Sequence, residues 1–292
     1  MPLLRSRAAL TVVILTVALA TACSTTGSQQ GDSPRKPSAT DTTTGPGGGA
    51  RTEVRAPTAN AAFDYQLGGA YPPPGKVQAV SRDREAKPVD GLYNICYVNA
   101  FQTQPGEAVT WWKKHHPDLL LKSDDGDLVI DEDWAEPLLD ISTPAKREAL
   151  MDIVGPWIDG CAAAHYDAVE PDNLDSYERS EGRLTAEHAA AFARLLADRA
   201  HQRHLAIAQK NTADLLPQRT RIGFDFAVVE ECGRYKECPE FSDAYGSRVF
   251  DIEYAKKDFA TACRAWGKEL SITLRDRDVR PAGTDGYLYQ SC

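Results

Sequence analysis

Eight apolar runs of strand length alternate with helix-like segments from residue 63 to the C-terminus, and this alternation constrains the fold most strongly. The expected strands are residues 63–67, 77–80, 93–98, 168–170, 205–209, 226–230, 249–253 and 270–274. Residues 138–141 could form an additional short strand. Such alternation is typical of a parallel sheet with crossover helices. Because roughly 230 residues suffice for one barrel, the pattern predicts an α/β fold, a (β/α)8 TIM barrel.

Two helices are predicted most clearly. Pro144 follows Thr143 as a proline at the first helical position follows a capping residue, and apolar residues then repeat at helical spacing. Pro156 is expected to kink or divide this helix. The second predicted helix covers residues 185–201.

The first 22 residues read as a targeting segment. Arg5 and Arg7 precede an apolar run at residues 8–20 that is too short to span a membrane comfortably, and small residues follow before Cys23. Cys23 resembles the lipidated cysteine of a bacterial lipoprotein. We therefore expect an exported protein, anchored by lipid to the outer face of the bacterial membrane or, alternatively, secreted.

Residues 23–62 are rich in Ser, Thr, Gly and Pro, with few large apolar side chains. A segment of this composition cannot bury enough surface to fold, so we expect a disordered tether. Residues 63–292 then form a single catalytic domain, which we expect to be monomeric.

The chain has a formal net charge of −9. Residues 1–22 carry +2 and residues 23–62 carry +1, which leaves about −12 on residues 63–292. Such a surface makes nucleic acid an unlikely partner. It keeps an exported protein soluble, and an acidic cleft would also attract a cationic substrate.

Besides Cys23, the chain has six cysteines, an even number that permits disulfides in an exported protein. They are Cys96, Cys161, Cys232, Cys238, Cys263 and Cys292. We expect bonds between Cys232 and Cys238 and between Cys263 and Cys292. The remaining two could pair, although Cys96 lies in an expected strand and could equally be a buried thiol. A zinc site at Cys232 and Cys238 is disfavoured because no histidine lies nearby in the sequence.

Polar side chains lie in or just after six of the expected strands. They are Asp64 and Tyr65, Tyr97 and Asn99, Asp172, Asn173 and Asp175, Lys210 and Asn211, Glu230 and Glu231, and Glu253 and Tyr254. The densest group lies in YDAVEPDNLD, residues 166–175. The carboxyl ends of barrel strands meet at one rim, where barrel enzymes hold their active sites. Each residue alone could be an ordinary loop or cap residue, but together they predict a carboxylate-rich active site.

An Asp and a Glu from different strands suit glycoside hydrolysis, in which one carboxyl group protonates the leaving oxygen and the other attacks or activates water. Tyrosine and tryptophan rings at the rim could stack on sugars. One alternative is a carbohydrate-binding lipoprotein without turnover. Another is a metal-dependent hydrolase using Asp172, Asp175 and a histidine, but all six histidines fall in or beside helical segments. Nothing in the sequence indicates a cofactor.

Seven motifs in order resemble glycoside hydrolase family 114, the endo-α-1,4-polygalactosaminidase-like barrels. They are FDYQLGG (63–69), ICYVNAF (95–101), LLDIS (138–142), YDAVEPDNLDSY (166–177), QKN (209–211), FDFAVVEEC (224–232) and VFDIEY (249–254). The resemblance spans nearly the whole chain after the tether. It implies a (β/α)8 barrel that cleaves α-1,4-linked galactosamine polymers internally.

The resemblance also implies that Asp172 and Glu230 are the catalytic acids. We expect Asp172 to be the nucleophile and Glu230 the general acid/base, because an apolar strand before Glu230 would favour its protonated form. The remaining polar residues of the rim would line the substrate groove. Two departures from the family pattern, the charged second strand VQAVSRD and the Asp-rich insert at residues 122–137, lie near that groove.

Overall fold

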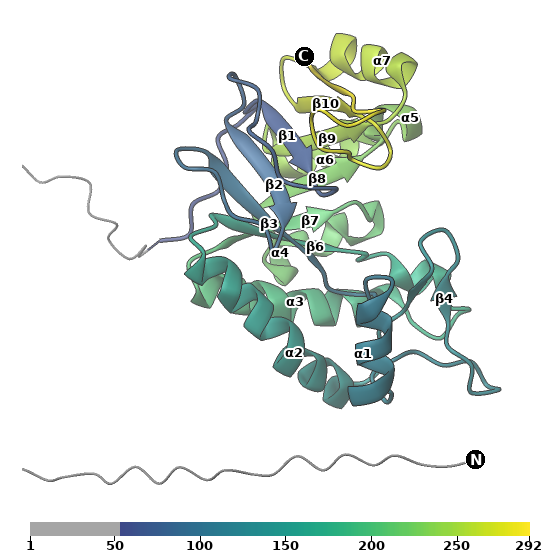
Figure 1. Cartoon of the computed structure of the whole chain (residues 1–292). Coiled ribbons are helices and arrows are strands. Elements are labelled where there is room, and N and C mark those ends of the chain that lie inside the picture. The colour runs from purple at the N-terminus through teal and green to yellow at the C-terminus, as the bar shows by residue number, and fades with distance from the viewer. Residues whose placement is uncertain (1–52) are drawn as a thin grey trace, which may run out of the picture. The chain divides into compact units, whose positions relative to one another are not determined.

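The computed structural model describes residues 53–292. Its main sheet has the order β1-β2-β3-β6-β7-β8-β9-β10-β11, in which β1 to β10 run parallel and β11 is antiparallel to β10. These strands are β1 (Phe63–Gln66), β2 (Ala79–Asp83), β3 (Tyr93–Asn99), β6 (Ala168–Asp172), β7 (Ala206–Lys210), β8 (Phe226–Glu230), β9 (Val249–Glu253), β10 (Ser271–Arg275) and β11 (Tyr289–Ser291). The eight parallel strands confirm the predicted (β/α)8 TIM barrel (Figure 1).

Helices follow most of the strands. They are α1 (Glu107–His115), α2 (Pro144–Ala163), α3 (Ala186–Gln202), α4 (Arg219–Ile222), α5 (Cys232–Tyr235), α6 (Cys238–Tyr245) and α7 (Lys256–Trp266), with 3-10 turns η1 (Ser176–Arg179) and η2 (Ala213–Gln218). Thr143 and Thr185 cap α2 and α3 by accepting backbone N–H bonds from Lys146 and His188, and the cap at Thr143 is the predicted one. The helix α2 continues through Pro156, so of the two expected effects, a kink or a division, the division is wrong.

The barrel is completed by side chains where β1 meets β10. The carbonyl oxygen of Phe63 in β1 accepts hydrogen bonds from Thr273 Oγ1 at 2.9 Å and from the Tyr289 hydroxyl at 3.2 Å. Tyr289 belongs to β11, which pairs with β10 and therefore covers this seam. The C-terminal strand thus contributes to closing the barrel.

Loops and a buried polar network, instead of helices, cover the outer face of β1 and β2. In the described chain, no helix occurs between β1 and β3. Asp64 accepts hydrogen bonds from Gln66, from the Tyr71 hydroxyl at 2.9 Å and from Arg275 at 3.3 Å. Arg82 in turn donates to Gln66 and to the carbonyl of Tyr71. Because these buried groups are mutually hydrogen-bonded, the network replaces the apolar contacts that a helix would supply.

The barrel interior is filled by alternate residues of the strands. Phe63, Ile95, Phe226 and Phe250 are buried there, and the rings of Phe63 and Phe250 lie 4.6 Å apart. Residues of the opposite parity, such as Val169 in β6, face the surrounding helices. This two-residue alternation determines which strand residues can reach the rim.

Three disulfides stabilise the domain. Cys232 is bonded to Cys238 and Cys263 to Cys292, as predicted, and Cys96 is bonded to Cys161. The alternative of a free buried thiol at Cys96 is therefore wrong.

The last part of the predicted tether is ordered against the domain. The backbone N–H of Asn60 donates to the carbonyl of Ser247 at 2.8 Å, and the Tyr93 hydroxyl donates to the carbonyl of Arg55 at 2.7 Å. Arg55 also forms an ion pair with Asp167. These partners precede or begin strands, so the chain enters the domain at the end opposite the carboxyl ends of the strands.

The predicted signal peptide and the candidate lipid anchor Cys23 lie outside the described residues. Within residues 53–292, no helix combines the length and the apolar composition that crossing a membrane requires.

Candidate active site

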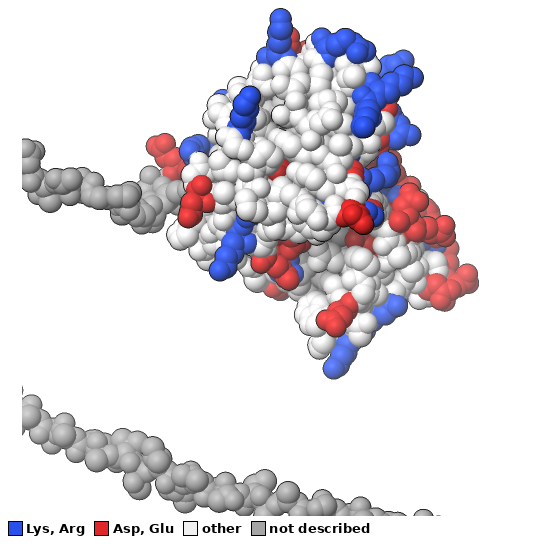
Figure 2. All heavy atoms as spheres, turned by 45° about the horizontal axis from the view of Figure 1, so that its top comes forward, with Lys and Arg blue, Asp and Glu red and all other residues white. Residues whose placement is uncertain are grey.

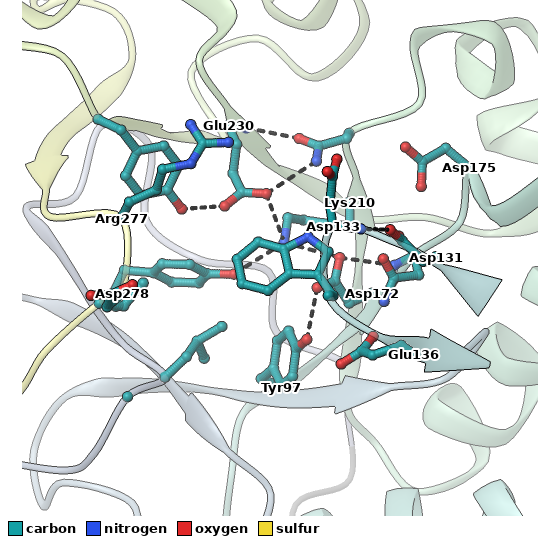
Figure 3. Close-up of a pocket in the computed structure, with 18 of the residues that line it drawn as sticks. Tyr97, Asp131, Asp133, Glu136, Asp172, Asp175, Lys210, Glu230, Arg277 and Asp278 are labelled. Carbon is teal, nitrogen blue, oxygen red and sulfur yellow. Dashed lines mark hydrogen bonds and ion pairs between the residues drawn. The ribbon is translucent and has the colours of Figure 1, made fainter. Parts of the chain in front are cut away.

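A cavity of about 660 Å³ opens at the carboxyl ends of the barrel strands. Nine acidic and three basic side chains line it (Figure 3). They are Asp83, Asp131, Asp133, Glu136, Asp172, Asp175, Glu230, Glu231 and Asp278, with Arg179, Lys210 and Arg277. The lining is therefore strongly acidic, and it gathers residues far apart in the sequence.

Lys210, at the end of β7, connects the carboxylates at the floor of this cavity. Its ammonium nitrogen lies 3.0 Å from Asp172 Oδ1 and 3.3 Å from Glu230 Oε2 (Figure 3). It also lies 3.4 Å from Oε1 of Glu170. Burial alone would lower the pKa of Lys210. The three carboxylates raise this pKa by more than burial lowers it, so it lies well above its ordinary value. Lys210 is therefore a permanent cation.

Asp172, at the end of β6, is held as a carboxylate. Burial raises its pKa, but the Lys210 ammonium and hydrogen bonds from Tyr97, Lys210 and the Asn173 N–H lower it below its ordinary value. The Tyr97 hydroxyl donates to Oδ2 at 2.7 Å and the Asn173 N–H donates to Oδ1 at 2.8 Å. An ionised carboxylate fixed in this way is suited to attack an electrophilic carbon.

Glu230, at the end of β8, lies across the cavity floor from Asp172. Its backbone N–H donates to Asn211 Oδ1 at 2.8 Å, and Asn211 Nδ2 donates back to its carboxyl group at 3.3 Å. The Tyr254 hydroxyl also donates to this carboxyl group. These surroundings are polar, so the apolar environment expected for Glu230 is wrong. The side chain is 29% exposed, which leaves it accessible to a substrate.

Glu170 lies below the pair and is fully buried. It accepts hydrogen bonds from the Tyr65 hydroxyl at 2.8 Å and from Ser81 Oγ at 2.5 Å. Burial raises its pKa to about 7, although Lys210 lowers it. Glu170 and Tyr65 together hold Lys210 from beneath, since the Lys210 ammonium also donates to the Tyr65 hydroxyl at 3.1 Å.

The hairpin of β4 (Ile130–Asp131) and β5 (Glu136–Pro137) forms one wall of the cavity. It carries Trp134, whose side chain is 57% exposed. Arg179 binds Asp131 at 2.8 Å and Asn99 Nδ2 donates to Glu136 at 2.9 Å, so both strands are attached to the barrel. Burial raises the pKa of Glu136 to about 7.

The backbone adopts left-handed conformations where β6, β7 and β8 end. The φ values are +65° at Asn173, +43° at Asn211, +61° at Thr212 and +59° at Glu231. A branched residue such as Thr212 rarely adopts this conformation. Gln209 supports it by donating from its side-chain amide to the carbonyls of residues 211 and 212. These turns direct the polar side chains toward the cavity.

Most of the predicted site residues lie together. Those that line the cavity are Tyr65, Tyr97, Asp172, Asn173, Asp175, Lys210, Asn211, Glu230, Glu231 and Tyr254. Asn99 lies beside them, where its side chain bridges Glu136 and Asn173.

Asp64 and Glu253 lie elsewhere, so the expectation that they line the groove does not hold. Both are fully buried on the outer face of the barrel, because strand alternation turns Tyr65 and Ile252 inward. Asp64 belongs to the network around Arg275, and Glu253 accepts a hydrogen bond from the backbone N–H of Gly233 at 2.7 Å.

Several cavity residues escaped the sequence analysis. They are the hairpin residues Asp131, Asp133, Trp134 and Glu136, and Tyr235, Arg277 and Asp278 at the rim. Glu170, buried beneath the floor, was also missed. The Asp-rich insert at residues 122–137 was the available signal for the hairpin. The side chains after β10 gave no comparable pattern.

The cysteine cluster offers no thiolate ligands for a metal. Cys232, Cys238 and Asp251 are close enough to surround an ion, but the two sulfurs are bonded to each other. None of the described residues that line the acidic cavity is a histidine.

Comparison with known proteins agrees with this architecture. The chain matches the model of glycoside-hydrolase family GH114 over residues 46–292. The structure of Aspergillus fumigatus Ega3 in complex with galactosamine superposes with a TM-score of 0.65 at 22% sequence identity, covering 84% of this chain and 100% of that chain. The glycoside hydrolase domain of PelA from Pseudomonas aeruginosa superposes with a TM-score of 0.56 at 17% identity, covering 76% and 97%. None of the curated proteins matches the chain. Because the family model covers most of its length, the protein belongs to glycoside-hydrolase family GH114 and is a glycosidase.

Proposed function

We propose that this protein cleaves α-1,4-linked galactosamine-containing polysaccharide within the chain, using Asp172 and Glu230 as its catalytic pair. The observation that carries the proposal is that Lys210 joins the two carboxyl groups at the floor of one acidic cavity in a barrel of this family. Internal cleavage and the α-1,4 linkage are supported by the family resemblance.

The charge of the cavity supports a galactosamine substrate. A deacetylated galactosamine unit carries an ammonium group, and nine acidic side chains line the cavity against three basic ones. Ammonium groups would be attracted to carboxylates such as Asp131, Asp133 and Asp175. The superposed Ega3 structure contains galactosamine, which agrees with this assignment.

In the proposed reaction, Asp172 is the nucleophile and Glu230 is the general acid/base. The carboxyl group of Glu230 gives its proton to the glycosidic oxygen as that bond breaks, while the Asp172 carboxylate bonds to the anomeric carbon. Water then attacks this carbon, Glu230 takes a proton from the water, and the bond to Asp172 breaks. Tyr97 and Lys210 would neutralise the returning charge on Asp172.

The spacing of the pair favours a retaining course. Asp172 Oδ1 and Glu230 Oε2 both lie within 3.3 Å of the Lys210 nitrogen, so they are separated by no more than about twice that distance. Retaining glycosidases hold their carboxyl groups about 5–5.5 Å apart and inverting ones about 6.5–9.5 Å apart. The sum of the two distances to Lys210 is the upper bound for these oxygens, and it lies below the inverting range.

For its setting, we propose export by residues 1–22 and attachment to the membrane through a lipid on Cys23 alone, with the domain acting as a monomer. The sequence of the leader is the support for export and attachment. A sugar-binding lipoprotein without turnover remains the competing function.

Product analysis on partly deacetylated α-1,4-galactosamine polymer tests the proposal. The parent should release oligosaccharides, and Asp172→Asn and Glu230→Gln should each lower the rate by about a thousandfold or more. NMR of the first products should show retained anomeric configuration.

Glu253→Gln is the matched control, because this glutamate lies outside the cavity and its replacement should leave cleavage intact. Parent-like rates in either cavity variant would refute the assigned pair. A parent that binds the polymer without releasing products would instead identify a sugar-binding protein.

A further inference from the structure

A second cavity, of about 440 Å³, lies beside the acidic one and differs from it chemically. Its lining residues are Arg84, Asn99, Gln102, Gln104, Glu107, Ala108, Trp111, Trp112 and Trp157. Gln104 lines both cavities, so the two are neighbours on the same rim. The second contains one acidic side chain, one basic side chain and three indole rings. It therefore lacks the negative charge that favours ammonium groups in the first.

The indoles come from α1 and α2, which Figure 1 shows at the lower side of the barrel. Trp112 is buried and meets Trp157 edge-on, with ring centres 6.3 Å apart. Trp111 lies edge-on to Trp112 at 5.4 Å, yet it is 41% exposed. Trp112 and Trp157 thus fix the wall, and Trp111 offers apolar surface to a ligand. Indole rings that line a concave site typically bind the CH face of a sugar or a methyl group.

Arg84 makes the second cavity unfavourable for a cation. Its guanidinium carbon lies 4.5 Å from the centre of the Trp157 ring, so this ring already carries a cation–π contact. Arg84 also forms an ion pair with the exposed Glu85 at 2.8 Å, so only part of its charge would act to repel the ammonium group of a deacetylated sugar. The acidic group of Glu107 is the single opposing charge among the lining residues.

Side-chain amides supply the polar part of the lining. Gln102 is 1% exposed, and its Nε2 donates to Asp131 at 3.2 Å. Its Oε1 is buried and has no hydrogen-bond partner within residues 53–292. A buried acceptor without a donor costs free energy, which a ligand N–H or hydroxyl would recover only after the Gln102 side chain turned toward the cavity. Gln104 and Asn99 are also neutral, but Gln104 Nε2 already donates to Asp83 at 3.1 Å and the Asn99 side chain bridges Glu136 and Asn173.

We infer that the second cavity is a distal subsite for a neutral, N-acetylated sugar unit of the polymer whose deacetylated units occupy the acidic cavity. The inference rests on the proposed function, because it takes the substrate class from there. The acetamido methyl group would pack on the indole rings, and a sugar without an ammonium group would not be repelled by Arg84. The enzyme would therefore select polymers that carry both kinds of unit.

Binding measurements on α-1,4-galactosamine oligosaccharides test the subsite. We would use calorimetric titration of the full chain carrying Asp172→Asn, which prevents cleavage, with fully N-acetylated and fully deacetylated probes. Adding Trp111→Ala should weaken binding of the acetylated probe about tenfold, as expected for loss of an aromatic contact, and change binding of the deacetylated probe less than about twofold.

Two further variants make the test specific. Trp134→Ala, an exposed tryptophan of the acidic cavity, is the matched control and should weaken the deacetylated probe more than the acetylated one. Arg84→Gln should strengthen the deacetylated probe severalfold, because the repelling charge is removed. Equal weakening of both probes by Trp111→Ala, or selective weakening of the deacetylated one, would overturn the subsite.

Cleavage assays distinguish failure of the subsite from failure of the proposed function. If Trp111→Ala, in a chain that keeps Asp172, cuts the polymer with the same KM as the parent, the subsite is refuted and the function stands. If the parent cuts no galactosamine polymer but binds the acetylated probe through Trp111, the subsite stands and the function is refuted.

Discussion

The ammonium of Lys210 helps to determine which carboxyl groups of the cavity floor are ionised. It lies 3.0 Å from Asp172 and 3.4 Å from Glu170, and burial raises the pKa of both acids. At Asp172 the nearby cation and the hydrogen bonds more than offset burial, whereas the pKa of Glu170 stays at about 7. The floor can therefore hold a reactive carboxylate without ionising every acid around it.

Glu253 provides a prediction about stability and pH. Burial raises its pKa from 4.5 to about 7, and it lies beside the buried Asp251, whose pKa burial also raises well above its ordinary value. Between these two values the folded protein binds more protons than the unfolded chain, so the free energy of unfolding falls as pH rises. The loss is complete above about pH 7 and amounts to about 3 kcal/mol at most. Glu253→Gln should remove this contribution.

Urea unfolding of the parent and Glu253→Gln at pH 4.5 and pH 8 measures the effect. The variant should have nearly parental stability at the lower pH and exceed it by up to about 3 kcal/mol at the higher pH. Glu240→Gln, at an exposed helix position, is the control and should change neither value. A stability difference between Glu253→Gln and the parent that does not depend on pH would contradict the assignment.

Among the structural elements, two disulfides should have separable effects. The bond between Cys263 and Cys292 closes 29 residues and fixes β11 at the seam, whereas the bond between Cys232 and Cys238 closes six residues beside the cavity. Chain entropy predicts that replacing the first pair by serine costs about 4 kcal/mol and the second about 2 kcal/mol.

Removing the bond between Cys232 and Cys238 should cost less stability but reduce catalysis more, because the segment held by this bond carries Glu231 and Tyr235 into the cavity. Urea unfolding and initial cleavage rates of the two double-serine variants measure both effects. The opposite order of activity losses would show that this segment does not shape the site.

The eight barrel strands were predictable within a few residues because each is a short apolar run between polar segments. The elements β4, β5 and β11 have two or three residues each, which is too short for a periodic pattern. The errors at Asp64 and Glu253 have a different cause. Sequence reasoning placed polar residues at strand ends, but it did not determine which face each side chain occupies, and a shift of one residue reverses that face.

At the scale of the whole molecule, the acidic surface and the point where the chain enters the domain lie in different places. Acidic side chains gather at the right-hand side of the view in Figure 2, the side on which Figure 1 places β4. The exposed acids of the insert at residues 122–137, which contains β4, are Asp124, Asp125, Asp127, Glu132 and Asp133. The chain instead enters the domain near Tyr93 and Ser247, at the opposite end of the barrel from the cavity. The point where the chain enters and the acidic cavity thus lie at different ends of the domain.

This arrangement predicts that salt weakens capture of a cationic polymer. The screening length falls from about 10 Å at 0.1 M salt to about 3 Å at 1 M, so the long-range attraction of the acidic rim should disappear over this range. For a deacetylated polymer, kcat/KM should fall about tenfold or more while kcat changes little, because capture depends on distant charges and the Lys210 contacts are short and buried. A largely acetylated polymer is the matched substrate, and its kcat/KM should vary less than about twofold. Steady-state rates at several salt concentrations measure both dependences. Equal salt dependence of the two polymers would mean that the acidic rim serves solubility and does not select the substrate.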